Sequence, residues 1–182
     1  MVNPFEYVFW RILRLFRRLH LARLVWMGSS TRMFTDLFKG FERVEAVRRI
    51  FGERTEAVLG NLKVEIIFFG YMGVDDTDGH LMVNGRYLKS GDKTDIYLDV
   101  VHELCHVKQW MDGRELFDSN YEYVDRPTEV EAYRYTVQEA KRIGLSTEQI
   151  LQYLKTEWMT PADLKRLVKN IDLEISESEA SN

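Results

Sequence analysis

Residues 95–113, which read DIYLDVVHELCHVKQWMDG, decide how the rest of the chain is interpreted. They contain His102, Glu103 and His106 in the pattern HExxH. On a helix, residues four apart lie one turn above each other, so both imidazoles can point at one metal ion. Glu103 then lies beside the metal, where its carboxylate can accept a proton and later donate it. The pattern is typical of metal-assisted peptide-bond hydrolysis, with Glu103 as general base and general acid.

The residues around the motif predict a strand that runs directly into a helix. The β-branched run at 95–101 favours the strand, and Gly113 is typical of the residue that ends a helix. Cys105 faces away from the two histidines, so we interpret it as a small core residue without chemistry. The helix has a core face made by Val100, Val101, Leu104, Val107 and Met111.

A catalytic zinc generally has three protein ligands, so a third is needed. Asp112 follows His106 by six residues, but Gln109 stands where a glycine would have to turn the chain back, which disfavours Asp112. A predicted helix at 128–143 offers two glutamates that point about 200° apart, so at most one faces the metal. Glu129 shares its face with small residues that permit close helix packing and is our first choice. Glu131 is the second choice, because with Thr128 it fits an N-terminal capping box.

The two segments HELCH (102–106) and EVEAY (129–133) resemble those of the zincin metallopeptidases, and specifically the gluzincin type. The resemblance implies an α+β fold, in which a small, mainly antiparallel sheet packs on the HExxH helix and on the following glutamate helix. It also implies Zn²⁺ as the cofactor, with His102, His106 and Glu129 as ligands, and a peptide or protein as the substrate.

The resemblance leaves the surroundings of the metal open. Many gluzincins carry an aspartate that steers a ligating histidine, and this chain has Tyr133 at that place. Asp99, Asp125 or a backbone carbonyl could hold the histidine instead. Tyr123 and Tyr133 could each donate a phenol hydrogen bond to a tetrahedral intermediate. His80 could bind substrate or stabilise an oxyanion, although an exposed turn histidine is the commoner case.

The remaining elements follow from hydrophobic periodicity and turn chemistry. We expect a helix at 34–51 that ends at Gly52, and a strand from Leu62 with period two. The dipeptide Asn84-Gly85 predicts a tight two-residue hairpin. Further helices are expected at 147–156, after Ser146 and Gln149, and at 161–171, after Thr160.

Composition limits the class of protein. The single cysteine excludes an internal disulfide, so we expect no disulfide-linked partner and a cytoplasmic location. Residues 61–182 carry 14 Lys and Arg against 23 Asp and Glu, which argues against a nucleic-acid partner. No run approaches the roughly 20 apolar residues that a membrane span needs.

The N-terminal segment forms a unit of its own. Apolar residues at helical spacing oppose four arginines over residues 5–26, which predicts a basic amphipathic helix within a first unit at 1–28. Its apolar face either packs on the domain or contacts an anionic membrane peripherally. The zincin-like unit is expected at 29–145, a C-terminal helical pair at 146–173, and a disordered tail at 174–182.

The sequence therefore predicts a zinc-dependent metallopeptidase. The alternative is a catalytically silent zinc-binding module that uses the same scaffold for regulation or for binding a partner, in one version at a membrane surface. The intact Glu103 favours the enzyme, because metal binding alone does not require that carboxylate.

Overall fold

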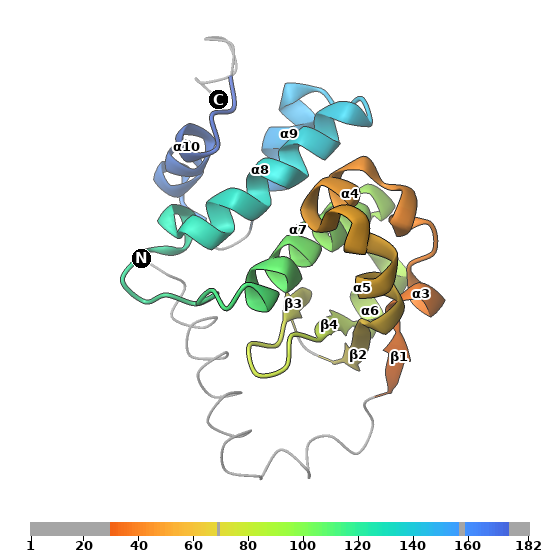
Figure 1. Cartoon of the computed structure of the whole chain (residues 1–182). Helices are drawn as coiled ribbons and strands as arrows, with labels where there is room; N and C mark the ends of the chain where they lie inside the picture. The colour runs from red at the N-terminus through yellow and green to blue at the C-terminus, as the bar shows by residue number, and fades with distance from the viewer. Residues whose placement is uncertain (1–29, 69, 157–158, 175–182) are drawn as a thin grey trace.

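The computed structural model describes residues 30–68, 70–156 and 159–174, which form a mixed α+β fold with a small four-stranded sheet (Figure 1). The strands are β1 (Thr31–Met33), β2 (Lys63–Ile67), β3 (Met72–Val74) and β4 (Leu81–Asn84). The helices are α3 (Phe34–Leu37), α4 (Glu45–Phe51), α5 (Thr55–Asn61), α6 (Gly85–Ser90), α7 (Lys93–Met111), α8 (Pro127–Arg142), α9 (Thr147–Leu154) and α10 (Pro161–Asn170). Short 3-10 turns lie at η1 (Phe41–Arg43), η2 (Gly52–Arg54) and η3 (Tyr123–Asp125).

The sheet has the strand order β1-β2-β4-β3. Both outer strands pair antiparallel with their neighbours, whereas the central strands β2 and β4 are parallel. The sheet is therefore mixed rather than uniformly antiparallel. The parallel pair arises because the chain leaves β2, forms β3 at the edge of the sheet, and returns as β4 between them.

Two hydrophobic clusters hold the helices in place. The first joins the sheet, α4 and α7, and includes Val64, Leu81, Val101 and Leu104. The second joins α8, α9 and α10 to Tyr97 and Leu98 of α7. Figure 1 shows α7 between the sheet and α8, with α9 and α10 beyond α8. The HExxH helix is thus the central element of the described chain.

The strand predicted at 95–101 is wrong, because α7 is already helical from Lys93. Asp92 begins this helix by accepting hydrogen bonds from the backbone N–H groups of Thr94 and Asp95. The last apolar residues of the run face the core of the helix packing, since Leu98, Val100 and Val101 are all buried. Tertiary burial therefore outweighs the β propensity of the two valines at 100 and 101. The predicted end at Gly113 is confirmed, because this residue has φ of 75° directly after the helix cap at Asp112.

The hairpin predicted at Asn84-Gly85 is also wrong. Asn84 has φ of −68° and ψ of 118°, whereas the first position of that turn requires a positive φ. Its side chain accepts hydrogen bonds from the backbone N–H groups of Arg86 and Tyr87, so Asn84 ends β4 and caps α6. The chain leaves the sheet here instead of turning back into it.

The single helix predicted at 34–51 is divided into α3, η1 and α4, with Gly40 in the left-handed region at φ of 89°. The predicted stop at Gly52 and the strand β2 are confirmed. The three C-terminal helices lie close to their predicted bounds, and Ser146 and Gln149 form the expected capping box. Thr160 also caps its helix, where Asp163 completes a second box.

The predicted amphipathic helix at residues 5–26 and almost all of the predicted tail lie outside the described residues, so their structure and the proposed membrane contact stay predictions. Among the residues that the structure describes, no helix has the length and apolar character needed to cross a membrane. The predicted C-terminal pair, α9 and α10, shares its hydrophobic cluster with α8.

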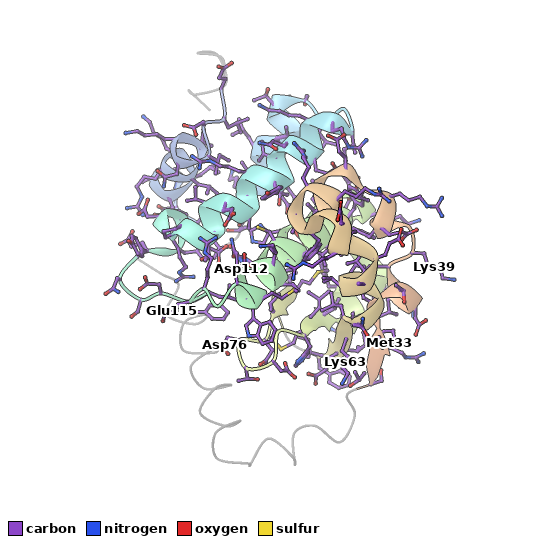
Figure 2. All side chains as sticks on the ribbon, in the orientation of Figure 1. Met33, Lys39, Lys63, Asp76, Asp112 and Glu115 are labelled. Carbon is purple, nitrogen blue, oxygen red and sulfur yellow. The ribbon has the colours of Figure 1, made fainter. Side chains whose placement is uncertain are left out.

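The loop between β3 and β4 is fastened to α7 through a close contact at Gly79. Trp110 donates a hydrogen bond from its indole nitrogen to the carbonyl of Asp76. In Figure 2, the label of Asp76 marks this loop and the label of Asp112 marks the end of α7. Gly79 has φ of 74°, and an added Cβ would overlap the Trp110 ring. Both the backbone angle and the available space require glycine at this position.

We predict that Gly79→Ala lowers the free energy of unfolding by about 2–5 kcal/mol, from the left-handed angle and the overlap together. Gly113→Ala is the matched control, because its φ of 75° is similar and no atom lies within 4 Å of the added Cβ. It should cost about 1–2 kcal/mol. Urea unfolding of both variants measures the difference, and equal losses would contradict the packing argument.

Candidate metal centre

Three ligand-type side chains converge between α7 and α8. The Nε2 atoms of His102 and His106 lie 3.0 Å apart. Glu129 Oε2 lies 3.3 Å from Nε2 of His102 and 3.5 Å from Nε2 of His106. All three residues are buried, with exposed fractions of 6%, 6% and 5%. Donors bound at about 2.0–2.1 Å to one tetrahedral ion lie about 3.3 Å apart, so this triangle has the size of a metal site.

The two helices reach this distance because the facing side of α8 carries small residues. Ala132 and Thr136 are fully buried, and the Thr136 hydroxyl donates to the carbonyl of Ala132 within its own helix. Because α7 and α8 pack closely, the Glu129 carboxylate lies near both imidazoles. The prediction that Glu129 lies on the closely packed face of α8, with Ala132 and Thr136, is therefore confirmed.

Glu131 points elsewhere and is not part of the triangle. Its carboxylate accepts hydrogen bonds from Gln109 and Arg114. The capping box predicted for Thr128 and Glu131 is wrong, because the Thr128 hydroxyl donates to the carbonyl of Leu116. The helix instead begins after Arg126 with Pro127 in its first turn. Asp112 forms an ion pair with Lys108 at the end of α7 and also lies outside the triangle.

Two further residues position the triangle, and the sequence analysis did not identify either of them. The side-chain oxygen of Gln109 lies 2.7 Å from Nδ1 of His106. Arg126 places a guanidinium nitrogen 3.6 Å from the second carboxylate oxygen of Glu129. The spacing of three between His106 and Gln109 on one helix is the only sequence signal for the first contact.

One buried carboxylate oxygen of the triangle supports a cation site. Glu129 Oε2 and His102 Nδ1 are buried and have no hydrogen-bond partner among the described residues. A buried polar atom without a hydrogen bond destabilises the fold. Glu129 Oε2 lies near two imidazole nitrogens but forms a hydrogen bond with neither, so another partner for it is expected. A metal ion at the centre of the three donors would satisfy that oxygen and both Nε2 atoms. The residues present therefore fit a metal ion.

The charges at the triangle are coupled. Burial raises the pKa of Glu129, but the nearby positive charges of His106 and His102 lower it by more, so its pKa lies well below the ordinary value. Burial lowers the pKa of His106, but Glu129 and Glu103 more than offset this and raise it to about 9. A metal ion bound by these side chains would compete with a proton for His106.

Glu103 lies next to His102 on α7 and is partly exposed. Burial is the largest influence on its carboxylate and raises its pKa, while the neighbouring histidines oppose that rise. A carboxylate with a raised pKa is suited to exchange a proton near neutral pH. Glu103 is not one of the three converging ligands, so it remains available for this role.

The other predicted residues are engaged with different partners. Asp99 accepts hydrogen bonds from the phenols of Tyr87 and Tyr153, and His102 Nδ1 has no hydrogen bond to it, so its expected role of holding a histidine is not seen. Tyr133 packs edge-on against His102 with ring centroids 4.5 Å apart. Its hydroxyl lies 3.0 Å from that of Tyr123, so these two phenols contact each other.

His80 belongs to a separate cluster and is not an exposed turn residue. Its ring nitrogens contact Glu65, which is buried in β2, and Asp78. With Asp75, residues 78 and 80 form a second group of metal-ligand type. Asp75 already accepts a hydrogen bond from the backbone N–H of Thr77, 2.8 Å away. The contacts of His80 therefore fasten the loop after β3 to the sheet.

No family model matches this chain, and neither a curated protein nor a solved structure shows significant similarity to it. The case for a function therefore rests on the geometry of the site.

We predict that the contribution of His80 to stability depends on pH. Burial lowers the pKa of His80, but the hydrogen bonds and charges of Glu65 and Asp78 raise it above the ordinary value of about 6.5. A raised pKa in the folded state stabilises the fold fully below pH of about 6.5, and this stabilisation is lost as pH rises through the folded-state pKa.

His80→Gln keeps a side chain that can donate to Glu65 but cannot titrate. The difference in free energy of unfolding between wild type and this variant should be largest near pH 6 and should shrink steadily toward pH 9. Urea unfolding across this range measures it. A difference that stays constant with pH would show that the pKa of His80 is the same in the folded and unfolded protein, and a difference that grows toward pH 9 would show that it is lowered on folding.

Proposed function

We propose that this chain is a zinc-dependent metallopeptidase of the zincin type, with His102, His106 and Glu129 as ligands and Glu103 as general base and acid. The observation that carries the proposal is the buried triangle of two imidazoles and one carboxylate, with a second carboxylate, that of Glu103, outside the triangle at the residue after His102. Two nitrogen donors and one oxygen donor from the protein are typical of catalytic zinc sites, which leave one position for water.

A bound zinc ion would supply Lewis acidity, polarising the scissile carbonyl and activating a water molecule for attack. Glu103 accepts the proton of the attacking water and delivers it to the leaving amine nitrogen, so the peptide bond breaks with one water consumed. Arg126 and Gln109 hold Glu129 and His106 in their orientations during this exchange. Tyr133 packs on His102 and limits the movement of that ring.

The second candidate is a zinc-binding module without catalysis. The ligand triangle fits it equally well, but it offers no role for Glu103. A partly buried carboxylate beside three other ionisable groups is unfavourable for folding, because its charge is desolvated and Glu129 repels it. We therefore favour the enzyme, acting on peptides or proteins in the cytoplasm.

We predict that protein purified without chelators contains about one zinc ion per chain and hydrolyses an unfolded protein substrate. Glu103→Gln should reduce turnover by about 100-fold or more while zinc content is unchanged, because the amide cannot accept the proton. Elemental analysis and a peptide-release assay measure the two quantities. Zinc-loaded wild type without hydrolysis would favour the silent module, and wild type that binds no zinc would refute both functions.

A second pair of variants separates the two glutamates of α8. Glu129→Ala should lose zinc and activity, since it removes a ligand. Glu131→Ala should retain about one zinc per chain, because its carboxylate faces Gln109 and Arg114. Zinc content after dialysis against a weak chelator measures the contrast. Retention by Glu129→Ala together with loss by Glu131→Ala would refute the ligand assignment.

A further inference from the structure

The amide of Gln109 connects the two helices that carry the ligands. Gln109 is 1% exposed and lies on α7, one turn after Cys105 and three residues after His106. Its side-chain nitrogen donates to the carbonyl of Thr128 over 2.9 Å and to Glu131 over 2.8 Å. Its side-chain oxygen lies 2.7 Å from His106 Nδ1. One buried side chain thus contacts a histidine ligand and the backbone residue that precedes Glu129.

These partners determine which end of the amide faces the histidine. The backbone carbonyl of Thr128 can only accept a hydrogen bond, and the carboxylate of Glu131 accepts as well. If the amide were reversed, its oxygen would face both acceptors and two hydrogen bonds would be replaced by repulsion. The oxygen of Gln109 must therefore face His106, and an amide oxygen has no proton to donate.

The orientation of the amide in turn determines the tautomer of His106. Since Gln109 Oε1 can only accept, Nδ1 of His106 carries the proton in the neutral ring. The lone pair is then on Nε2, the atom that faces His102 Nε2 and Glu129 Oε2. The tautomer of a neutral imidazole decides which nitrogen can bind a metal, so this contact selects the productive one.

We propose that Gln109 is a positioning residue of the metal centre that selects the Nδ1–H tautomer of His106 and holds the first turn of α8 in register with α7. The inference rests on the proposed metal site and adds to it a residue that touches neither metal nor substrate. The two roles are joined, because the hydrogen bond from this amide to the Thr128 carbonyl on α8 also keeps its oxygen toward the histidine.

The test uses the full chain and compares zinc affinity between variants by chelator competition at fixed pH. Gln109→Met keeps the length of the side chain but makes none of the three hydrogen bonds, and it should weaken zinc binding about 10- to 100-fold. Gln109→Asn keeps the amide but is one methylene too short to reach both helices, so it should also lose affinity. It provides a second variant if the methionine variant does not fold.

Cys105→Ala is the matched control. Cys105 is buried on the same helix, and its sulfur lies 3.5 Å from the Gln109 nitrogen, but among the described residues this sulfur has no hydrogen bond to the His106 ring. Its removal should lower the thermal midpoint through lost packing while the zinc dissociation constant stays within twofold of wild type. A purely structural role of Gln109 would give the same result as this control.

Nitrogen NMR of the histidine side chains in zinc-loaded wild type tests the tautomer directly. We expect His106 to be protonated at Nδ1 and bound through Nε2. Binding through Nδ1, or zinc affinity of both Gln109 variants within twofold of wild type, would overturn the inference. Failure of the proposed function is distinguishable, because zinc-loaded wild type that hydrolyses no peptide leaves both the affinity and the tautomer measurements intact.

Discussion

The burial of two imidazoles and a carboxylate between α7 and α8 is the constraint on which the rest of the structure depends. Such groups are unfavourable in a protein interior unless each is compensated. Gln109 compensates one nitrogen of His106 and Arg126 faces one oxygen of Glu129, yet the other carboxylate oxygen has no hydrogen bond in the described part of the chain. The helix pair therefore carries a cost that a bound cation would relieve, so metal binding at the proposed site would also stabilise the fold.

The parts of the site that could be predicted from the sequence are those that depend on helical spacing alone. His102 and His106 converge because any helix brings residues four apart together. The wrong prediction of a strand before them therefore did not affect the prediction of these two ligands. Glu129 was predictable because Ala132 and Thr136 mark the side of α8 that packs closely. Both inferences need only the 3.6-residue repeat and the size of side chains.

The predictions that failed depend on partners distant in the sequence. Asn84-Gly85 is suited both to a tight hairpin and to a helix start, and only the position of β4 beside β2 decides between them. In the sequence, Gln109 was considered only as a position that lacks glycine. Its role depends on contacts with Thr128 and Glu131, about 20 residues later, which helical spacing does not reveal. The same holds for His80, which lies in a loop and contacts Glu65 on β2, 15 residues earlier.

The position of α8 between the two hydrophobic clusters has a thermodynamic consequence. Ala132 belongs to the cluster of the sheet and α7, whereas Tyr133 and Val137 belong to the cluster that holds α9 and α10. Tyr153 of α9 also donates a hydrogen bond to Asp99, one turn before His102. With a metal ion in the proposed site, its binding and the docking of the C-terminal helices would be linked equilibria, so a molecule that captured α9 and α10 would weaken metal binding from a distance.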